Sequence, residues 1–298
     1  MPATDLHCGF VALAGRPNVG KSTLLNALVG VKLSIVTPRP QTTRHRILGL
    51  VQLPDAQIGI LDTPGLHRQA GRALNKAMNR TAAAALSDAD VVVLVLEALV
   101  WTAEDSFALE RVARSGRPAL AVVNKIDRVR PRERLLPYLA ELAERHPFLA
   151  LVPVSALKAQ GVERLLPVLA QHLPLGPPLF DRDVLTDRGL EFRIAEMVRE
   201  KLTFELNQEL PYGIAVAVER LQALDGQLQA DVIIWVEREG QKPIVIGAGG
   251  QRLKRVGSAA RRALNGQLAQ RVHLNLWVKV RENWADNARA LQDLGLDS

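Results

Sequence analysis

The first 173 residues alternate between short apolar runs and amphipathic stretches. The apolar runs are almost continuous Val, Ile, Leu and Ala, which is typical of strands buried on both faces of a parallel sheet. They predict six strands, at Gly9–Ala14, Arg46–Gln52, Gln57–Leu61, Val91–Leu96, Ala119–Val123 and Leu149–Val154. The amphipathic stretches predict five helices, at Ser22–Val29, Arg72–Ala85, Glu104–Arg114, Pro131–Arg145 and Val162–His172.

Helices between successive strands predict a doubly wound α/β domain with a mostly parallel sheet. Residues Arg46–Leu61 are the exception, because two predicted strands are joined only by a short turn at Pro54-Asp55. They predict a hairpin and therefore one antiparallel edge of the sheet.

A composition change marks the end of this part. Leu173–Leu179 contains three prolines and one glycine, which cannot continue a helix. We assign residues 1–173 to a first domain, 174–183 to a linker and 184–298 to a second domain. Two domains are also what a chain of 298 residues favours.

The second domain predicts an α+β fold in the order helix, strand, strand, helix, strand, helix. The turn between its first two strands is expected at Asp225-Gly226. The elements are predicted at Arg188–Glu205, Gly213–Ala223, Gln229–Glu239, Gln251–Gln267, Arg271–Arg281 and Asn283–Leu291.

One segment between the first strand and the first helix fits the phosphate-binding pattern G-x-x-x-x-G-K-[ST]. In such a loop backbone N–H groups surround the phosphates, the lysine reaches the β- and γ-phosphates, and the hydroxyl holds Mg²⁺. The candidate nucleotide-binding residues here are Gly15, Arg16, Pro17, Asn18, Val19, Gly20, Lys21, Ser22 and Thr23.

Asp62-Thr63-Pro64-Gly65 follows the third predicted strand. Asp62 is placed to hold Mg²⁺ through water, and the Gly65 N–H to sense the γ-phosphate. The irregular loop Pro38–Arg44 supplies a threonine that can reach Mg²⁺, and we favour Thr43 over Thr42. We therefore assign hydrolysis of the bound nucleoside triphosphate to four residues, Lys21, Thr43, Asp62 and Gly65.

Asn124-Lys125-Ile126-Asp127 follows the fifth predicted strand and selects the base. The Asp127 carboxylate can accept both N1–H and the exocyclic amine of guanine, whereas adenine would leave this charge unpaired. Lys125 can lie over the base, and Asn124 can tie this segment to the phosphate loop. The backbone of Ser155, Ala156 and Leu157 is a weaker candidate for the guanine carbonyl.

Charge is unevenly distributed in the second domain. The whole chain carries a net charge of +7 with a pI near 9.9, yet residues 181–239 hold 13 acids and seven bases, and residues 242–281 hold nine bases and no acid. In this basic region lies Gly247-Ala248-Gly249-Gly250, placed between a predicted strand and a predicted helix. It matches the GxxG loop of a KH domain, which clamps about four nucleotides of single-stranded RNA. The candidate RNA-binding residues are Gly247, Ala248, Gly249, Gly250, Gln251, Arg252, Lys254 and Arg255.

The combination resembles the Era GTPases, which join a G domain to a C-terminal KH domain, here of the bacterial, type II form. The resemblance covers almost the whole chain and also includes Gln41–His45 and the tail Trp277–Trp284. It implies binding and slow hydrolysis of GTP to GDP, Mg²⁺ as cofactor, contact with the 3′ end of 16S rRNA, and a role in assembly of the small (30S) ribosomal subunit. It also implies a loose association with the inner face of the bacterial membrane.

Hydrolysis needs a substitute for the water-orienting glutamine of many switch GTPases, because Leu66 follows Gly65. His67 comes next and is more often structural than catalytic in such a position. In related GTPases with an asparagine in the phosphate loop and an apolar residue after D-x-P-G, the asparagine helps to hold K⁺. We therefore expect Asn18 to contribute to a K⁺ site.

Two other functions stay open at this point, a P-loop kinase acting on a metabolite and a scaffold that binds guanine nucleotide without hydrolysing it. We expect a monomer in the cytoplasm. One cysteine, Cys8, excludes a disulfide framework. No secretory signal is visible, and the longest apolar run, Val91–Leu96, is too short to span a membrane.

Overall fold

The computed structural model describes residues 6–39, 42–66, 72–206, 210–224, 226–268 and 270–296. Its contacts divide the chain into two compact units. The first unit runs up to Asp187, except for two short segments, Ile35–Arg39 and Arg72–Leu74, which group with the second unit from Arg188 onward.

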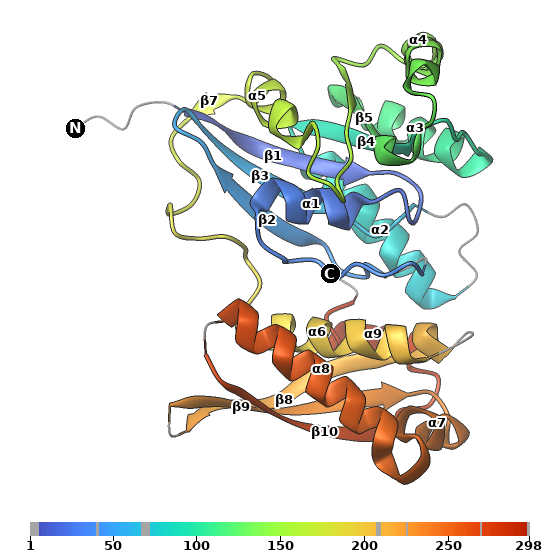
Figure 1. The fold of residues 1–298 in the computed structure, drawn as a ribbon, viewed down its shortest axis with the longest axis vertical. Coiled ribbons are helices and arrows are strands. Elements are labelled where there is room, and N and C mark those ends of the chain that lie inside the picture. The colour runs from blue at the N-terminus through green and yellow to red at the C-terminus, as the bar shows by residue number, and fades with distance from the viewer. Residues whose placement is uncertain are drawn as a thin grey trace. The chain divides into compact units, whose positions relative to one another are not determined.

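The first unit is built on a seven-stranded sheet in which six strands follow the order β2-β3-β1-β4-β5-β6 (Figure 1). All neighbours in this path are parallel except β2 and β3, which form the antiparallel hairpin that the sequence predicts. The strands are β1 (Leu6–Ala14), β2 (Ile47–Gln52), β3 (Ala56–Asp62), β4 (Val91–Glu97), β5 (Ala119–Asn124), β6 (Leu151–Pro153) and β7 (Leu175–Gly176).

Helices cover both faces of this sheet (Figure 1). Helices α1 and α5 contact β1, β2 and β3 on one face, and α2, α3 and α4 pack on the other face against alternate residues of β1, β4 and β5. The helices are α1 (Lys21–Val29), α2 (Ala73–Asp88), α3 (Ala103–Ser115), α4 (Leu135–Arg145) and α5 (Leu165–Ala170). Strands buried on both faces explain the unbroken apolar runs of the sequence.

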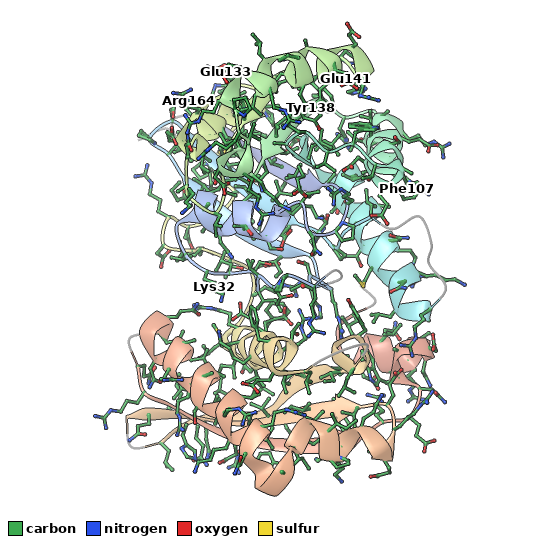
Figure 2. The ribbon with its side chains drawn as sticks, turned by 45° about the vertical axis from the view of Figure 1, so that its right-hand side comes forward. Lys32, Phe107, Glu133, Tyr138, Glu141 and Arg164 are labelled. Atoms are coloured by element: carbon green, nitrogen blue, oxygen red, sulfur yellow. The ribbon has the colours of Figure 1, made fainter. Side chains whose placement is uncertain are left out.

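The amphipathic pattern of α4 sets its orientation. Tyr138 is 9 % exposed and belongs to the core, where its hydroxyl donates to the Val100 carbonyl at 3.0 Å, while Glu141 projects away from the sheet (Figure 2). The predicted helix began at Pro131, but a 3₁₀ turn over Arg132–Arg134 precedes α4. A similar turn, Val162–Arg164, precedes α5.

The first unit extends beyond the boundary that the prolines predict. β7 pairs antiparallel with the start of β1, in what was expected to be a linker. Further on, the Gln57 side chain accepts the backbone N–H groups of Leu179 and Phe180 and donates to the Phe180 carbonyl. The Phe180 ring also meets the Phe10 ring edge-on. The contacts therefore place the boundary at Asp187, later than residue 173.

The second unit has a three-stranded sheet in the order β10-β9-β8, with β8 antiparallel and β10 parallel to β9. Helices α6 and α8 lie along one face of it (Figure 1). The elements are α6 (Leu190–Glu205), β8 (Ala215–Leu224), β9 (Gln227–Val236), α7 (Lys242–Ile246), α8 (Gln251–Leu268), β10 (Val272–Val280) and α9 (Ala288–Asp293). The prediction of a doubly wound domain followed by an α+β domain is confirmed. Asp225, expected in the β8–β9 turn, lies outside the described residues.

The prediction that a strand precedes the GxxG loop is wrong. Residues Lys242–Ile246 form the short helix α7, which Pro243 opens near its first position. Proline suits that place because its fixed φ matches a helix and its missing N–H has no partner in the first turn. A 3₁₀ turn over Trp284–Asp286 similarly precedes α9. Among the described residues, no helix is long and apolar enough to cross a membrane.

Candidate functional site

The phosphate loop between β1 and α1 is held in a conformation that only small residues permit. Gly15 and Gly20 have φ of 140° and 104°, in the region that L side chains rarely adopt. A Cβ on Gly15 would lie 2.5 Å from the Val95 carbonyl oxygen, and one on Gly20 would lie 2.2 Å from the Asn124 amide nitrogen. The loop therefore packs directly on β4 and on the last residue of β5, as a cradle of backbone N–H groups requires.

Lys21 lies at the start of α1 and is only 6 % exposed. Its amine donates to the carbonyls of Gly15 at 2.9 Å and Arg16 at 3.0 Å, so the charge is held inside the loop. Burial lowers the pKa of Lys21 to about 8, because the charged form loses water, although the nearby Asp62 carboxylate opposes this shift. A buried cation beside backbone N–H groups is the arrangement that favours a phosphate chain.

Three hydroxyls gather around Asp62 at the end of β3. Ser22 and Ser34 donate to its Oδ2 at 2.7 and 2.8 Å, and the hydroxyls of Ser22 and Thr43 lie 2.7 Å apart. This proximity favours Thr43, as the sequence analysis did, and the structure adds Ser34, which sequence reasoning missed. Ser34 carries no motif signal, so only its position in the fold reveals it.

The donor set at Asp62 fits Mg²⁺. Asp62 is fully buried, and its Oδ1 has no hydrogen-bond partner among the described residues. Burial raises the pKa of Asp62, because the carboxylate loses water, while the Ser22 hydroxyl and the Lys21 charge act in the opposite direction. Mg²⁺ prefers carboxylate and hydroxyl oxygens together with phosphate and water. Ser22 and Thr43 would hold the ion with Asp62 behind them, and the ion would neutralise charge on the phosphates.

The D-x-P-G segment lies against the phosphate loop. Thr63 donates to the Leu13 carbonyl at 2.7 Å, Pro64 is buried, and a Cβ on Gly65 would come within 2.8–3.0 Å of three atoms of Pro17. Leu66 donates its backbone N–H to the Gly15 carbonyl at 3.3 Å, and its side chain is buried in the core. An apolar, buried Leu66 cannot orient water. His67 lies outside the described residues, as does Gln41.

Asn124 joins three parts of the nucleotide site. Its amide donates to the Val19 carbonyl at 2.8 Å, and its Oδ1 accepts the backbone N–H groups of Lys125 and Ala156 at 2.8 and 2.9 Å. The residue is 2 % exposed. The tie to the phosphate loop that the sequence predicts is therefore present, and the same side chain also fixes the Ser155–Leu157 segment.

Asp127 is half-buried, and its Oδ1 accepts the Ser155 hydroxyl at 2.6 Å, which orients the carboxylate. The Ser155 N–H bonds to the Gln160 carbonyl, and the Ala156 N–H is used by Asn124. Of the three backbone N–H groups proposed for the guanine carbonyl, the Leu157 N–H is the one without such a bond among the described residues.

An ion-pair network that the motifs do not contain supports this segment. Glu97, at the end of β4, accepts from Lys125 Nζ at 2.8 Å and Arg16 at 3.1 Å. Arg16 also donates to both oxygens of Asp105, which forms a capping box with Thr102 at the start of α3. Burial alone would raise the pKa of Glu97, but Lys125 and Arg16 outweigh it and lower that pKa. In the sequence, Glu97 could have been found only from its position at the end of a predicted strand, because α/β sheets bind ligands at the carboxyl ends of their strands. Arg16 thus offers a nucleotide its backbone rather than its guanidinium.

Elsewhere in the phosphate loop, Val19 is fully buried and Asn18 is exposed with φ of 62°. Thr23 is half-buried on α1, directly after Ser22, whose hydroxyl lies beside Asp62. These positions agree with a loop whose backbone faces the nucleotide and whose apolar side chain anchors it in the core.

In the second unit the Gly247–Gly250 loop connects α7 to α8. Gly247, Gly249 and Gly250 have φ of 76°, 55° and 76°, and the Gly250 N–H bonds to the Gly247 carbonyl at 3.0 Å. A Cβ on Gly247 would lie 2.7 Å from Arg252 Cβ, so this glycine allows the loop to fold tightly onto α8. Ala248 and Gly249 are exposed at its tip.

The basic residues after the loop have different partners. Arg252 donates to the Ile244 carbonyl, which ties it to α7, and Arg255 pairs with Glu205 at 3.0 Å. The Glu205 carboxylate raises the pKa of Arg255. Gln251 and Lys254 are exposed at the start of α8, and Lys254 has no partner among the described residues. Of these three cations, Lys254 is therefore the most available to a phosphate.

Comparisons with known proteins agree with this division. Residues 10–125 match the family model described as 50S ribosome-binding GTPase, and residues 209–285 match that of the KH domain. The chain is 48 % identical to GTPase Era of Stenotrophomonas maltophilia strain K279a over 294 residues, covering 99 % of both chains. The chain belongs to the Era family of GTPases. It is also 47 % identical to GTPase Era of Xylella fastidiosa strain M12, with 98 % of both chains covered.

Two solved Era structures match the fold of this Era-family chain with a TM-score of 0.95 at 38 % identity, covering 98 % of this chain and all of theirs. One is a variant of Aquifex aeolicus Era bound to GDP and AlF₄⁻, and the other is an Era in complex with MgGDPNP and nucleotides 1506–1542 of 16S rRNA. The chain is thus a GTPase with a C-terminal KH domain, and Mg²⁺ is its cofactor, as the oxygen donors around Asp62 also indicate.

Proposed function

We propose that this Era-family chain is a GTP-controlled switch that binds the single-stranded 3′ end of 16S rRNA and assists assembly and maturation of the small ribosomal subunit. The observation that carries the RNA proposal is the Gly247–Gly250 loop at the start of α8, with its exposed tip and acid-free flanks. The relative bound to nucleotides 1506–1542 of 16S rRNA supports the choice of RNA.

The loop suits a sugar-phosphate chain for a steric reason. Ala248 and Gly249 present almost no side chain, so RNA backbone can approach the N–H groups closely, as in other KH domains. Lys254 follows within the first turn of α8. The Lys254 charge and the backbone N–H groups of the loop both attract a phosphate, whatever base it carries. Selectivity for particular bases therefore has to come from other contacts.

The switch part rests on the two segments that meet the phosphate loop. Thr43 lies at the Mg²⁺ donors and Gly65 lies against Pro17. Both are placed to contact the γ-phosphate or its Mg²⁺, and both lose that contact after hydrolysis. We propose that this difference controls RNA affinity.

We further propose that hydrolysis is slow and uses K⁺ in place of an arginine or glutamine. The buried Leu66 side chain supports this proposal, because it removes the usual means of orienting water. Asn18, exposed in the phosphate loop, is the proposed protein ligand of K⁺.

The test of the RNA proposal is a single added charge at the loop tip. Ala248 is exposed and has an ordinary φ, so Ala248→Asp places a carboxylate beside the bound phosphates without straining the fold. We expect the affinity of the full chain for an RNA of nucleotides 1506–1542 of 16S rRNA to fall at least about tenfold.

Ala288→Asp is the matched control. Ala288 is also exposed, at the start of α9, where an acidic residue is favourable. The control should bind RNA like the parent chain. Equal RNA affinity of Ala248→Asp and the parent would refute the proposed RNA site.

Location and assembly state stay predictions. We propose a cytoplasmic monomer with peripheral contact to the inner face of the membrane, on the basis of the family resemblance alone. Fractionation of cells by ultracentrifugation tests the location, and sedimentation of the purified chain tests the monomer.

A further inference from the structure

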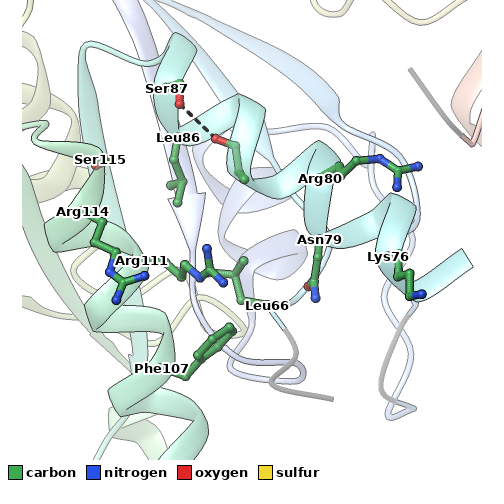
Figure 3. A pocket seen from close by; sticks show the side chains of 11 residues that line it. Leu66, Lys76, Asn79, Arg80, Leu86, Ser87, Phe107, Arg111, Arg114 and Ser115 are labelled. Atoms are coloured by element: carbon green, nitrogen blue, oxygen red, sulfur yellow. Dashed lines mark hydrogen bonds between the residues drawn. The ribbon is translucent and has the colours of Figure 1, made fainter. Parts of the chain in front are cut away.

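A groove between α2 and α3 lies outside the nucleotide site and the GxxG loop. It encloses about 430 Å³, which lies within the range of small-ligand sites, about 300–1,000 Å³. In Figure 3 Asn79 of α2 and Arg111 and Phe107 of α3 lie at the space between the two helices, while the Arg80 side chain extends from α2 away from α3. Its lining is Leu66, Lys76, Asn79, Arg80, Leu86, Phe107, Arg111, Arg114 and three smaller residues, Ala83, Ser87 and Ser115.

The charge of this groove has one sign. Lys76 and Arg80, four residues apart on α2, form one wall, and Arg111 and Arg114, three apart on α3, form the other. Such spacings place each pair on one helix face. Among the residues that the structure describes, no acidic residue lines the groove, and the nearby Glu110 pairs with Arg114 at 2.6 Å. Two separate basic walls suit a ligand with two anionic groups.

An aromatic ring and neutral polar groups complete the site. Phe107 is half-buried in the groove, with the Arg111 guanidinium 5.0 Å above the ring centroid. Asn79 lines the groove from α2 and Phe107 lines it from α3, where the ring lies beside Arg111 (Figure 3). A planar group can lie against a ring while the cations hold its charges.

Leu66 connects the groove to the D-x-P-G segment, which is proposed to respond to the nucleotide. Leu66 lines the groove, and the Leu66 N–H bonds to the Gly15 carbonyl in the phosphate loop. Gly65, the residue before it, lies against Pro17. A ligand in the groove therefore touches the segment whose position responds to the nucleotide.

We propose that the α2–α3 groove is a second ligand site, for a small planar molecule carrying two phosphate groups, and that its occupancy changes nucleotide release through Leu66. This site does not depend on RNA binding. Its ligand is recognised by two basic walls and a ring, whereas the guanine site recognises its ligand through Asp127.

The test uses adenosine 3′,5′-bisphosphate as the probe and the full chain loaded with GDP and Mg²⁺. Its adenine lacks the guanine donors that Asp127 accepts, so it does not compete for the first site. We expect saturable binding of one probe per chain by calorimetry. In the double variant Lys76→Gln, Arg111→Gln the affinity should fall at least about tenfold, and inorganic pyrophosphate should bind the parent chain more weakly than the probe.

Arg132→Gln with Arg164→Gln is the matched control, since it removes the same charge from exposed 3₁₀ turns that do not line the groove. The control should bind the probe like the parent chain. The proposal would be overturned if probe binding did not saturate or if both double variants lost the same affinity for the probe. Binding of long polyanions but not of the probe would also overturn it.

A second measurement separates a binding groove from a regulatory one. The probe should change the dissociation rate of a fluorescent GDP analogue from the parent chain at least about twofold, and leave the rate of the Lys76→Gln, Arg111→Gln variant unchanged. An identical rate with and without a saturating concentration of the probe would overturn the proposed link through Leu66.

Discussion

The side-chain amide of Asn124 donates to the Val19 carbonyl at 2.8 Å, across 105 residues of sequence. This bond joins the phosphate loop to the segment that the sequence predicts to select guanine. The Asn124 Oδ1 holds the Ser155–Leu157 segment as well, so one buried side chain sets the distance between base and phosphate contacts.

Asn124→Asp should weaken both the fold and nucleotide binding. The carboxylate can no longer donate to Val19 and faces its carbonyl oxygen in a buried place, which costs about 1–3 kcal/mol. We expect a lower free energy of unfolding by about that amount in urea, and at least about tenfold weaker GDP binding. Asn287→Asp is the matched control, since either side chain can cap α9. Equal stability of Asn124→Asp and the parent would contradict the account.

Asp127→Asn should change base preference. The Asp127 carboxylate is oriented by the Ser155 hydroxyl and is placed to accept from guanine. An amide offers one donor and one acceptor, which suit xanthine instead. We expect GTP affinity to fall by roughly 10- to 100-fold, and XTP affinity to rise, measured by competition with a fluorescent GDP analogue. Asp231→Asn, on β9, serves as the control. An unchanged preference for GTP would refute the base-reading role.

Gly65→Ala should separate hydrolysis from binding. A Cβ at Gly65 would come within 2.8–3.0 Å of Pro17, two of the three close atoms being backbone, so the D-x-P-G segment must move away from the phosphate loop. We expect GTP turnover to fall at least about tenfold while GDP affinity changes little, because GDP lacks the γ-phosphate that this segment senses. Gly240→Ala, with open space around it, should behave like the parent. Full turnover in Gly65→Ala would contradict the assignment.

GTP turnover should depend on K⁺. In KCl we expect faster hydrolysis than in NaCl at equal ionic strength, and Asn18→Ala should remove the difference. Single-turnover phosphate release measures this directly. Equal rates in the two salts would exclude K⁺ as the source of the missing charge.

The sequence predicted the motif residues, but not the residues outside the motifs that hold them in place. Asn124, Thr43 and Asp62 follow from spacing, because each comes at the end of a strand or in a loop of fixed order. Ser34 and Glu97 lie far from those motifs in sequence, and only the packing of β3, β4 and α1 brings them to the site. No local pattern contains such tertiary contacts.

Errors in the predicted elements have local causes. Val245 and Ile246 favour a strand by residue type, yet Pro243 starts a short helix there and Gly247 ends it. β7 has only two residues, and its pairing with β1 depends on the fold rather than on an apolar run. The Gln57 contacts to Leu179 and Phe180 likewise extend the first unit past the prolines.

The RNA affinity of the GxxG loop should fall with salt. If about four phosphates are neutralised, the log–log slope is roughly −3 for single-stranded RNA. Arg252 and Arg255 already have protein partners, so Lys254→Gln should reduce the steepness of the slope more than either arginine variant. Titrations at several KCl concentrations measure it. An RNA affinity that does not change with salt would mean that the RNA binds outside this basic loop.

The most direct test of the switch is the affinity of the full chain for an RNA of nucleotides 1506–1542 of 16S rRNA, measured with GDP and with a non-hydrolysable GTP analogue. The account predicts at least about tenfold tighter RNA binding with the analogue. By linkage, RNA must then raise the preference of the chain for the analogue over GDP by the same factor. Identical RNA affinities in the two nucleotide states would contradict it.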